Sequence, residues 1–192
     1  MTASQVAIAL RTLAGLAERT ADQSERIVAL ARRYAETLRA GGTLFFAGNG
    51  GSAADAQHLA TEYIVRYSAR LARGPFAALA LTTDTSLLTA AANDLGFEQV
   101  FARQVTGLCR PGDLLILHST SGNSPNLLAA AQAARAGGVP VVAFLGAGGG
   151  ALRNLVDEAF VVDSTETSHT QEIHLAVEHI IVGLVERELG EG

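Results

Sequence analysis

The sequence predicts an α/β fold, namely a doubly wound, five-stranded parallel sheet with helices on both faces. Short apolar runs, of the length of buried strands, alternate with helical stretches of about ten or more residues. Glycine-rich and serine-rich loops follow two of these runs, at the strand ends where such folds bind ligands. The 192 residues contain no internal repeat, low-complexity tract or linker. We therefore expect a single domain over residues 1–192.

Two amphipathic helices are expected over residues 2–40, because apolar side chains recur there at helical spacing. Asp22 is a candidate cap for the second helix, and Gly41-Gly42 would end it. The chain is 48% hydrophobic, so we expect part of its apolar surface to be covered by other subunits. The helical pair 1–40 is the segment expected to serve this oligomer packing.

The remaining elements alternate along the chain. The expected strands are 43–47, 77–81, 114–117, 139–145 and 159–162. The expected helices are 53–64, 84–92, 97–108, 125–136, a short one at 152–156, and a long C-terminal helix over 168–189. The helical stretches 84–92 and 97–108 are expected to be separated by Asn93-Asp94-Leu95-Gly96.

Charge and residue usage exclude several classes of function. The net charge of −5 and the absence of a basic cluster argue against nucleic acid and anionic membranes as partners. No apolar run approaches the ~18 residues of a membrane span. All fourteen basic residues are arginine, which excludes Schiff-base, pyridoxal-phosphate and P-loop chemistry. The single cysteine, Cys109, and the lack of a signal-peptide pattern favour a cytoplasmic location.

The loop Gly48-Asn49-Gly50-Gly51-Ser52 connects the first expected strand to the next helix. A strand, a glycine turn and a helix N-terminus together form an anion site, because free N–H groups and the helix dipole point outward. The segment also fits the dinucleotide pattern G-x-G-x-x-A. However, Asp84 lies far beyond the position expected of a ribose-binding acid. A nicotinamide-binding domain is therefore the weaker alternative, and we expect no nucleotide cofactor.

The loop Ser119-Thr120-Ser121-Gly122-Asn123-Ser124 follows the third expected strand. Pro125 suits the first position of a helix, which makes Ser124 the expected N-cap. The segment is either an ordinary capped loop or a phosphate cradle built from hydroxyls and backbone N–H groups. The absence of lysine from the chain, and of arginine from this stretch, favours the cradle.

Two further clusters carry titratable side chains. His58 and Glu62 are four residues apart and share one helix face, either as a surface pair or as part of a site. The last helix contains Gln171-Glu172-Ile173-His174 and, further on, His179. On an ideal helix Gln171 and His179 are about 80° apart and share a broad face, whereas His174 points elsewhere, which favours a structural role.

Together these segments resemble the phosphoheptose isomerase (sedoheptulose-7-phosphate isomerase) family of the SIS domain superfamily. The resemblance covers nearly the whole chain and rests on Gly48–Ser52, His58-x-x-x-Glu62, Asn93-Asp94, Ser119–Ser124 and Gln171-Glu172-Ile173-His174 with His179. It implies a flavodoxin-like SIS domain with two leading helices. The implied reaction converts sedoheptulose 7-phosphate to D-glycero-D-manno-heptose 7-phosphate through an enediol, in heptose biosynthesis.

The resemblance also implies roles for individual residues. Glu62 and His179 would be the catalytic acid/base pair. One zinc ion would be bound by His58, Glu62, Gln171 and His179, a ligand set without thiolate that suits this metal. The residues implied to bind substrate are Ser119, Thr120, Ser121 and Ser124 for the phosphate, and Asn49, Gly50, Gly51, Ser52, Glu62, Asn93, Asp94 and Gln171 for the sugar.

On a straight helix Gln171 and His179 are separated by about 12 Å along the axis, a wide span for two ligands of one ion. We therefore expect either that neighbouring subunits complete each site or that the last helix is irregular near Gln171. The resemblance implies a homo-oligomer, a homotetramer with its sites at subunit interfaces.

Two stretches depart from the family pattern. His118 stands where relatives carry a small or aliphatic residue, and residues 163–170 differ from the usual lead-in to Gln171. Both departures bear on which sugar the pocket accepts. Two alternatives stay open. One is a non-catalytic SIS sugar-phosphate-binding or regulatory protein; such relatives lack an acid/base pair at these positions, so the presence of Glu62 and His179 favours the isomerase. The other is an SIS isomerase or lyase for another sugar phosphate, such as a pentose or amino-sugar phosphate.

Overall fold

The structure, a computed structural model, describes residues 2–70 and 72–190. Five strands form one sheet in the order β2-β1-β3-β4-β5, and every neighbouring pair is parallel. The strands are β1 (Leu44–Gly48), β2 (Ala78–Ala80), β3 (Leu114–Ser119), β4 (Val141–Leu145) and β5 (Glu158–Val161). This flavodoxin-like order reverses between β1 and β3, the point at which ligands bind in such sheets. The predicted fold class is therefore confirmed.

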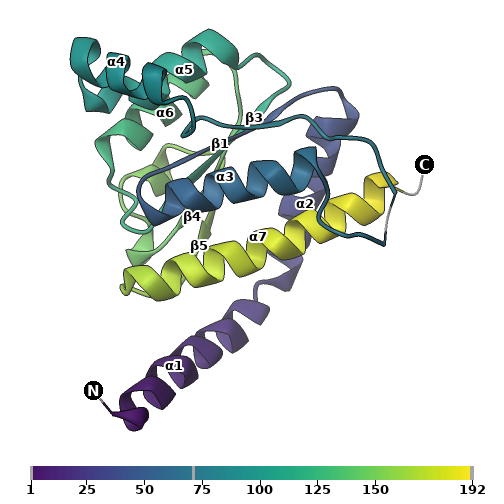
Figure 1. The fold of residues 1–192 in the computed structure, drawn as a ribbon, viewed down its shortest axis with the longest axis vertical. Coiled ribbons are helices and arrows are strands. Elements are labelled where there is room, and N and C mark those ends of the chain that lie inside the picture. Colours follow the sequence, from purple (N-terminus) through teal and green to yellow (C-terminus); the bar gives the residue numbers. More distant parts are fainter. Residues whose placement is uncertain (1, 71, 191–192) are drawn as a thin grey trace.

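Helices cover both faces of the sheet (Figure 1). They are α1 (Ala3–Ala21), α2 (Ser24–Arg39), α3 (Gly51–Ile64), α4 (Thr85–Leu95), α5 (Val100–Leu108), α6 (Pro125–Ala136) and α7 (Thr167–Gly190), with 3₁₀ turns η1 (Phe97–Gln99), η2 (Ala147–Gly149) and η3 (Leu152–Asn154). Alternate strand residues face opposite sides. Phe46 and Ile116 pack with α2, α3 and α7, whereas Phe45 and Leu117 pack with α5 and α6. Burial on both faces explains why the strands are apolar throughout.

Three local predictions need correction. Asp22 ends α1 and does not cap α2, whose N-cap is Gln23 without a side-chain hydrogen bond. Asn93 and Asp94 continue α4, which breaks only at Gly96, where φ is +90° and a side chain would be strained. The helix expected at 152–156 is the short 3₁₀ turn η3. In each case the element is present and its boundary differs.

Helix α1 projects from the body of the molecule (Figure 1). Its last turns pack against the core through Leu16, which is 2% exposed. Its first half instead leaves Val6, Ile8 and Leu10 about 60% exposed. Nothing in the described part of the chain covers this apolar stretch. Among the described helices, α1 included, none combines the length and apolarity needed to cross a membrane.

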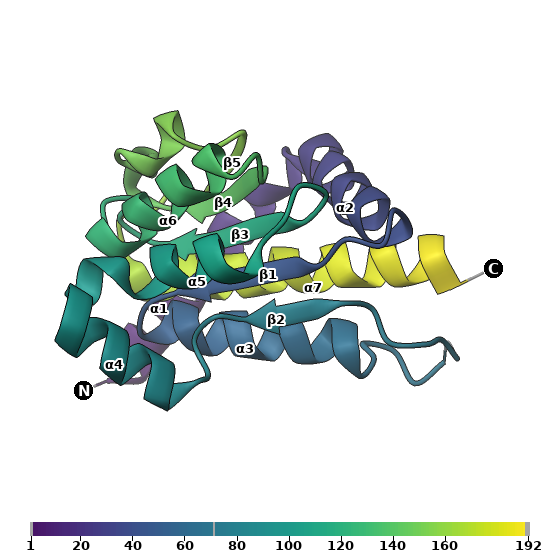
Figure 2. The same cartoon turned by 90° about the horizontal axis from the view of Figure 1, so that it is seen from above.

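Helices α3 and α7 lie side by side on one face of the sheet (Figure 2). They run in the same direction, because Gln171 contacts Ser52 near both N-terminal ends and His179 contacts His58 further along. Helix α7 is continuous from Thr167 to Gly190. The alternative expectation of an irregular helix near Gln171 is therefore wrong, and the candidate site is built along this helix pair.

Candidate active site

A cavity of about 300 Å³ lies at the carboxyl ends of β1 and β3, where the strand order reverses. It joins the glycine loop, the serine loop and the start of α7. Its lining residues are Asn49, Gly50, Gly51, Ser52, His118, Ser119, Thr120, Ser124, Thr167 and Gln171. Most of the residues predicted to bind substrate therefore share one cavity.

Three helices direct their N-terminal ends at this cavity. Helix α3 begins at Gly51, α6 follows its N-cap Ser124, and α7 begins at Thr167; all three of these residues line the cavity. Neither N-cap, Gly50 nor Ser124, gives a side-chain hydrogen bond to its own helix. The first N–H groups of α3 and α6, and the Ser124 hydroxyl, are thus available to a ligand.

No lysine or arginine is found among the residues lining the cavity. The helix dipoles and hydroxyls therefore provide the attraction for an anion.

Close backbone packing fixes the two loops. Gly122 has φ of +66°, and a Cβ there would lie 1.9 Å from the carbonyl oxygen of Gly149. The Ser119 hydroxyl accepts a hydrogen bond from the Gly122 N–H at 3.0 Å. A Cβ on Gly51 would lie 2.7 Å from the side-chain amide of Gln171. These glycines let the loops approach η2 and α7, and this close packing shapes the cavity wall.

Besides Glu62, which belongs to the group described next, three residues predicted to bind substrate lie outside the cavity lining. Ser121 is exposed, and its hydroxyl accepts from the Asn123 N–H at 3.2 Å. Asn93 and Asp94 are exposed at the end of α4 and hydrogen-bond to each other at 2.7 Å. Their predicted roles are not supported by contacts within one chain.

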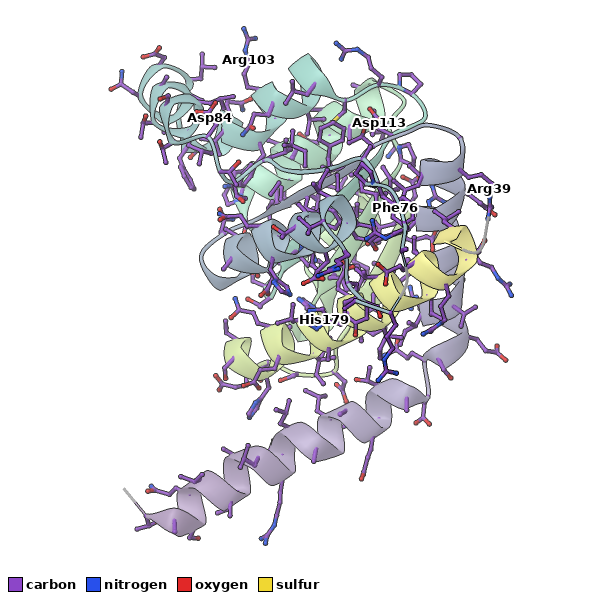
Figure 3. The ribbon with its side chains drawn as sticks, turned by 45° about the vertical axis from the view of Figure 1, so that its right-hand side comes forward. Arg39, Phe76, Asp84, Arg103, Asp113 and His179 are labelled. Atoms are coloured by element: carbon purple, nitrogen blue, oxygen red, sulfur yellow. The ribbon has the colours of Figure 1, made fainter. Side chains whose placement is uncertain are left out.

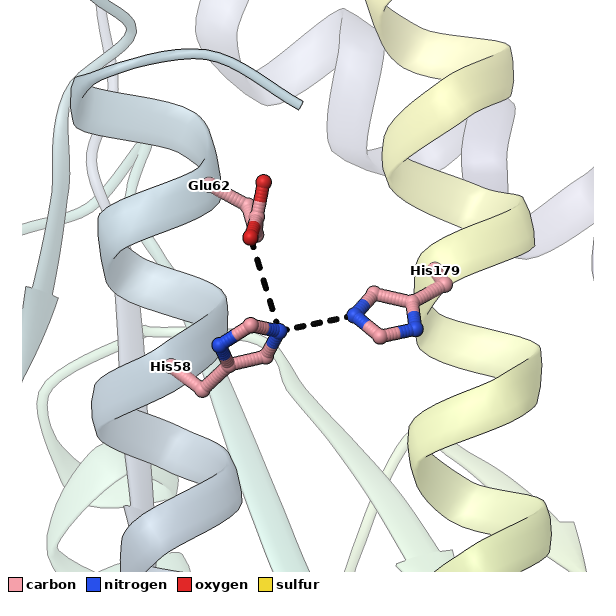
Figure 4. A group of neighbouring side chains, drawn as sticks. All are labelled: His58, Glu62 and His179. Carbon is pink, nitrogen blue, oxygen red and sulfur yellow. Dashed lines mark hydrogen bonds and ion pairs between the residues drawn. The ribbon is translucent and has the colours of Figure 1, made fainter. Parts of the chain in front are cut away.

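A second group, composed of His58, Glu62 and His179, lies further along the helix pair (Figure 4). The Nε2 atoms of His58 and His179 are 2.7 Å apart, and His58 Nε2 lies 3.5 Å from Glu62 Oε1. His179 reaches from α7 toward α3 (Figure 3), and the three ligand atoms lie within 4.8 Å of one another. Two imidazole nitrogens and a carboxylate oxygen suit zinc. Of the four predicted metal ligands, the structure brings these three together.

Gln171 instead lies at the cavity, where its amide donates to the Ser52 hydroxyl at 3.3 Å. Ser52 and His58 are six residues apart on α3, so the cavity and the histidine group are separated by about 9 Å along the helix. The site therefore has two ends, which we call the phosphate end (the cavity) and the histidine end (His58, Glu62 and His179).

A buried arginine supports the histidine end. Arg73 donates to the carbonyl oxygens of Glu62 and Tyr63, each at 2.8 Å, and its guanidinium covers the Phe76 ring. Its Nε pairs with the Glu186 carboxylate at 2.8 Å, and both side chains are at most 3% exposed. The end of α3 is thereby tied to α7. The sequence analysis did not identify this pair.

Asp55 is a second residue that the sequence analysis missed. It lies one turn before His58 on α3. This spacing places both side chains on the same helix face, and it could have identified Asp55 from the sequence as a neighbour of the site. Burial raises the pKa of its carboxyl group, and the nearby His118, His58 and His179 oppose that rise. Thr167, also missed, carried no signal beyond its place at the start of the last helix.

Two further histidines are buried beneath the site. His174 contacts the carbonyl oxygen of Leu145 through Nε2 at 3.1 Å. Burial, with a smaller effect of His118, lowers the pKa of His174 to about 3, so this side chain is neutral and structural, as expected. His118 Nε2 lies 3.0 Å from Oε1 of Glu178, and neither side chain is exposed.

Comparisons with known proteins agree with this geometry. The chain matches the SIS domain family over residues 10–146. The phosphoheptose isomerase of Roseiflexus sp. (strain RS-1) is 53% identical over 169 residues, which is 88% of this chain and 85% of that protein.

Two solved structures are also similar. That of phosphoheptose isomerase GmhA from Neisseria gonorrhoeae has a TM-score of 0.89 at 36% identity and covers 96% of this chain and 98% of its own. That of a phosphoheptose isomerase from Francisella tularensis has a TM-score of 0.92 at 31% identity, over 97% and 100% of the two chains. Sequence and fold agree, and the chain belongs to the phosphoheptose isomerase family of SIS-domain proteins.

Proposed function

We propose that this protein is an aldose–ketose isomerase that converts sedoheptulose 7-phosphate to D-glycero-D-manno-heptose 7-phosphate. The observation that carries the proposal is the two-ended site. An anion cavity at three helix N-termini lies about 9 Å along α3 from a carboxylate–imidazole group. An elongated sugar with a phosphate at one end and a carbonyl at the other matches this arrangement. Relatives at 53% identity carry the name phosphoheptose isomerase.

The proposed mechanism uses two side chains. Glu62 removes a proton from C1 of the ketose and returns it to C2, while His179 moves a proton between the two oxygens. The intermediate is an enediol, and since substrate and product are isomers, no co-reactant is consumed. The Glu62 side chain is 18% exposed, so solvent access to the base is restricted. Ser119, Thr120 and Ser124 hold the phosphate, with Ser121 completing the loop.

The same residues fit a zinc ion. His58, Glu62 and His179 would hold it, with the Gln171 amide as the further ligand implied by the family. When bound, zinc polarises the substrate oxygens and stabilises negative charge on them. Within one chain the Gln171 amide lies beside Gly51 and Ser52, away from the other three ligands. For Gln171 to be the fourth ligand, its side chain has to turn toward His58 and His179 in the assembled protein.

We further propose that each site is completed by a neighbouring copy in a homotetramer. Asn93 and Asp94, which lie outside the cavity of their own chain, are followed by Leu95 and Phe97 at 51% and 59% exposure. An apolar patch of this kind beside two polar residues fits a subunit interface. The exposed first half of α1 is a second apolar surface for the same assembly.

The test is to incubate pure protein with sedoheptulose 7-phosphate and to follow the anomeric proton signals by NMR. Glu62→Gln removes the base while keeping shape, so turnover should fall by about 10³-fold. The matched control is Glu172→Gln, because this exposed carboxylate on α7 pairs, among the residues that the structure describes, only with His169, at 2.9 Å. The control should turn over like the parent.

Inorganic phosphate binding by Glu62→Gln should remain at the parent level, because the phosphate end does not include this residue. Parent-like turnover by Glu62→Gln would show that another group is the base. No turnover by the parent, with phosphate still bound, would favour a sugar-phosphate-binding protein instead.

A further inference from the structure

A buried imidazole–carboxylate pair lies between β3 and α7. His118 Nε2 is 3.0 Å from Oε1 of Glu178, and both side chains are 0% exposed. The His118 ring is enclosed by Phe46 and Phe144, with centroid distances of 6.3 and 5.4 Å. The Tyr34 hydroxyl donates to the same carboxylate oxygen at 3.3 Å. None of these contacts is used by the isomerase mechanism proposed above.

Stability does not explain the pair. Burying two ionisable groups costs desolvation that their attraction often fails to recover, and apolar residues of similar volume are commonly as stable. Within the described residues, His118 Nδ1 and Glu178 Oε2 have no hydrogen-bond partner. Unpartnered buried polar atoms add a further penalty and call for another explanation. Burial of this pair is therefore not expected to add to the free energy of folding.

Its position in the two elements provides that explanation. His118 lies in β3 immediately before Ser119, the first residue of the serine loop, and is itself among the residues that line the cavity. Glu178 lies in α7 immediately before His179, the residue of the histidine end. One hydrogen bond thus joins the segment that holds the phosphate to the segment that presents the acid/base imidazole.

We propose that His118 and Glu178 are a positioning pair that sets the location of His179 relative to the phosphate-holding loop. The proposal rests on the isomerase function, because it concerns the alignment of a substrate held at one end and reacting at the other. Loss of alignment should lower kcat much more than it weakens binding of the phosphate group. Misplacement of a reacting group by about 1 Å can lower a rate about 100-fold.

The test compares His118→Leu, Glu178→Leu and the double variant H118L/E178L. Each single variant leaves one buried polar group unpaired and should melt at a lower temperature than the parent. The double variant should recover part of that loss, since both members of the pair are gone and only the Tyr34 hydroxyl is left without its acceptor. Its kcat should nevertheless stay about 10- to 100-fold below the parent. Binding of inorganic phosphate should be unchanged, because the His118 side chain is 0% exposed although the residue borders the cavity.

Two further variants separate positioning from general disturbance. Glu178→Gln keeps an oxygen that accepts from His118 and should keep kcat within about threefold of the parent, since the hydrogen bond persists. Tyr34→Phe removes a hydrogen bond to the same carboxylate oxygen without touching the link between β3 and α7. It should also retain turnover. A loss in Tyr34→Phe as large as in His118→Leu would contradict the proposal.

The melting temperature and kcat of the double variant decide between positioning and a purely structural role. Recovery of both melting temperature and kcat would show a structural role only and overturn the inference, while the isomerase function would still stand. If the parent itself does not turn over, the positioning role is tested by calorimetry, which compares how tightly the parent and the double variant bind sedoheptulose 7-phosphate. The double variant should lose at least about fivefold in affinity for the sugar phosphate and nothing for inorganic phosphate. Equal affinities for the sugar phosphate would overturn the proposal.

Discussion

The phosphate end and the histidine end of the site are built in different ways. The phosphate end consists of loop backbone, hydroxyls and helix N-termini, and neither lysine nor arginine is among its lining residues. The histidine end consists of long side chains from α3 and α7, and its His58 side chain is 44% exposed. The first end is therefore determined by chain topology, whereas the second depends on contacts that hold two helices in register.

Helix α7 serves both ends and connects them. Gln171 contacts the glycine loop, His174 is buried one turn later, and His179 lies at the histidine end. A disturbance of α7 should therefore affect alignment, whereas a change within the serine loop should affect phosphate binding alone. The predictions below test this division, beginning with the largest effect.

Arg73→Met should be the most damaging change to the histidine end. It removes the charged partner of the buried Glu186 carboxylate, which keeps only its hydrogen bonds from the Tyr67 and Ser68 N–H groups, and breaking a buried ion pair in this way typically costs about 3–5 kcal/mol of unfolding free energy. It also removes the donors to the carbonyl oxygens of Glu62 and Tyr63. Urea unfolding measures the loss. The control Arg39→Met, which breaks an exposed ion pair with Glu188, should change stability by less than about 1 kcal/mol.

If Arg73→Met lowers the unfolding free energy no more than Arg39→Met does, the Arg73–Glu186 pair does not hold the end of α3 against α7. The histidine end would then have to be stabilised from outside the chain, for example by a neighbouring subunit.

His179→Ala should reduce zinc affinity by at least about 100-fold, because it removes one of three converging ligands. Calorimetric titration of zinc into metal-free protein measures this. His169→Ala is the matched control, since His169 pairs with the exposed Glu172 and is not part of the group. Inorganic phosphate should bind equally to both variants. A common loss of zinc and phosphate binding would contradict the division into two ends.

The sequence was informative for the phosphate end because its signals are local. Gly48–Ser52 and Ser119–Ser124 each follow a strand directly, so the topology alone places them together. Gly122 and Ser124 also occupy the turn and cap positions that their residue types favour.

The supports of the histidine end carried no local signal. Arg73 and Glu186 are 113 residues apart, and His118 and Glu178 are 60 apart. Such pairs depend on side-chain orientation in the folded chain, which neither periodicity nor spacing encodes. The His58–Glu62 pair, in contrast, was predictable from the sequence, because both residues lie on one helix four positions apart.

The pH dependence of stability tests the middle of α7. Burial lowers the pKa of His174 to about 3, whereas in the unfolded chain it is about 6.5. Below pH 6.5 the unfolded chain gains a proton that the folded chain does not accept until about pH 3. The stability associated with this group is therefore complete above pH 6.5 and falls by about 1.4 kcal/mol per pH unit below it.

Between pH 6.5 and 5 the loss should be about 2 kcal/mol, measured by urea unfolding. His174→Gln keeps a donor for the carbonyl oxygen of Leu145 but does not titrate. Its unfolding free energy should therefore fall less steeply over the same range. Equal slopes for parent and variant would show that His174 does not determine the acid sensitivity of α7.

The smallest expected effect distinguishes a ligand-binding cap from a structural one. Ser124 caps α6 without a side-chain hydrogen bond, whereas Asp84 caps α4 by accepting from the Leu87 N–H at 2.9 Å. Ser124→Ala should therefore cost less than about 0.5 kcal/mol of stability, and Asp84→Ala about 1 kcal/mol.

For the affinity for inorganic phosphate the order of the two variants reverses. Ser124→Ala should weaken inorganic phosphate about tenfold, as expected for one hydrogen bond to a charged group, and Asp84→Ala not at all. If instead Ser124→Ala destabilises the fold and leaves phosphate affinity unchanged, its hydroxyl serves the helix, and the phosphate end must be assigned to the remaining lining residues.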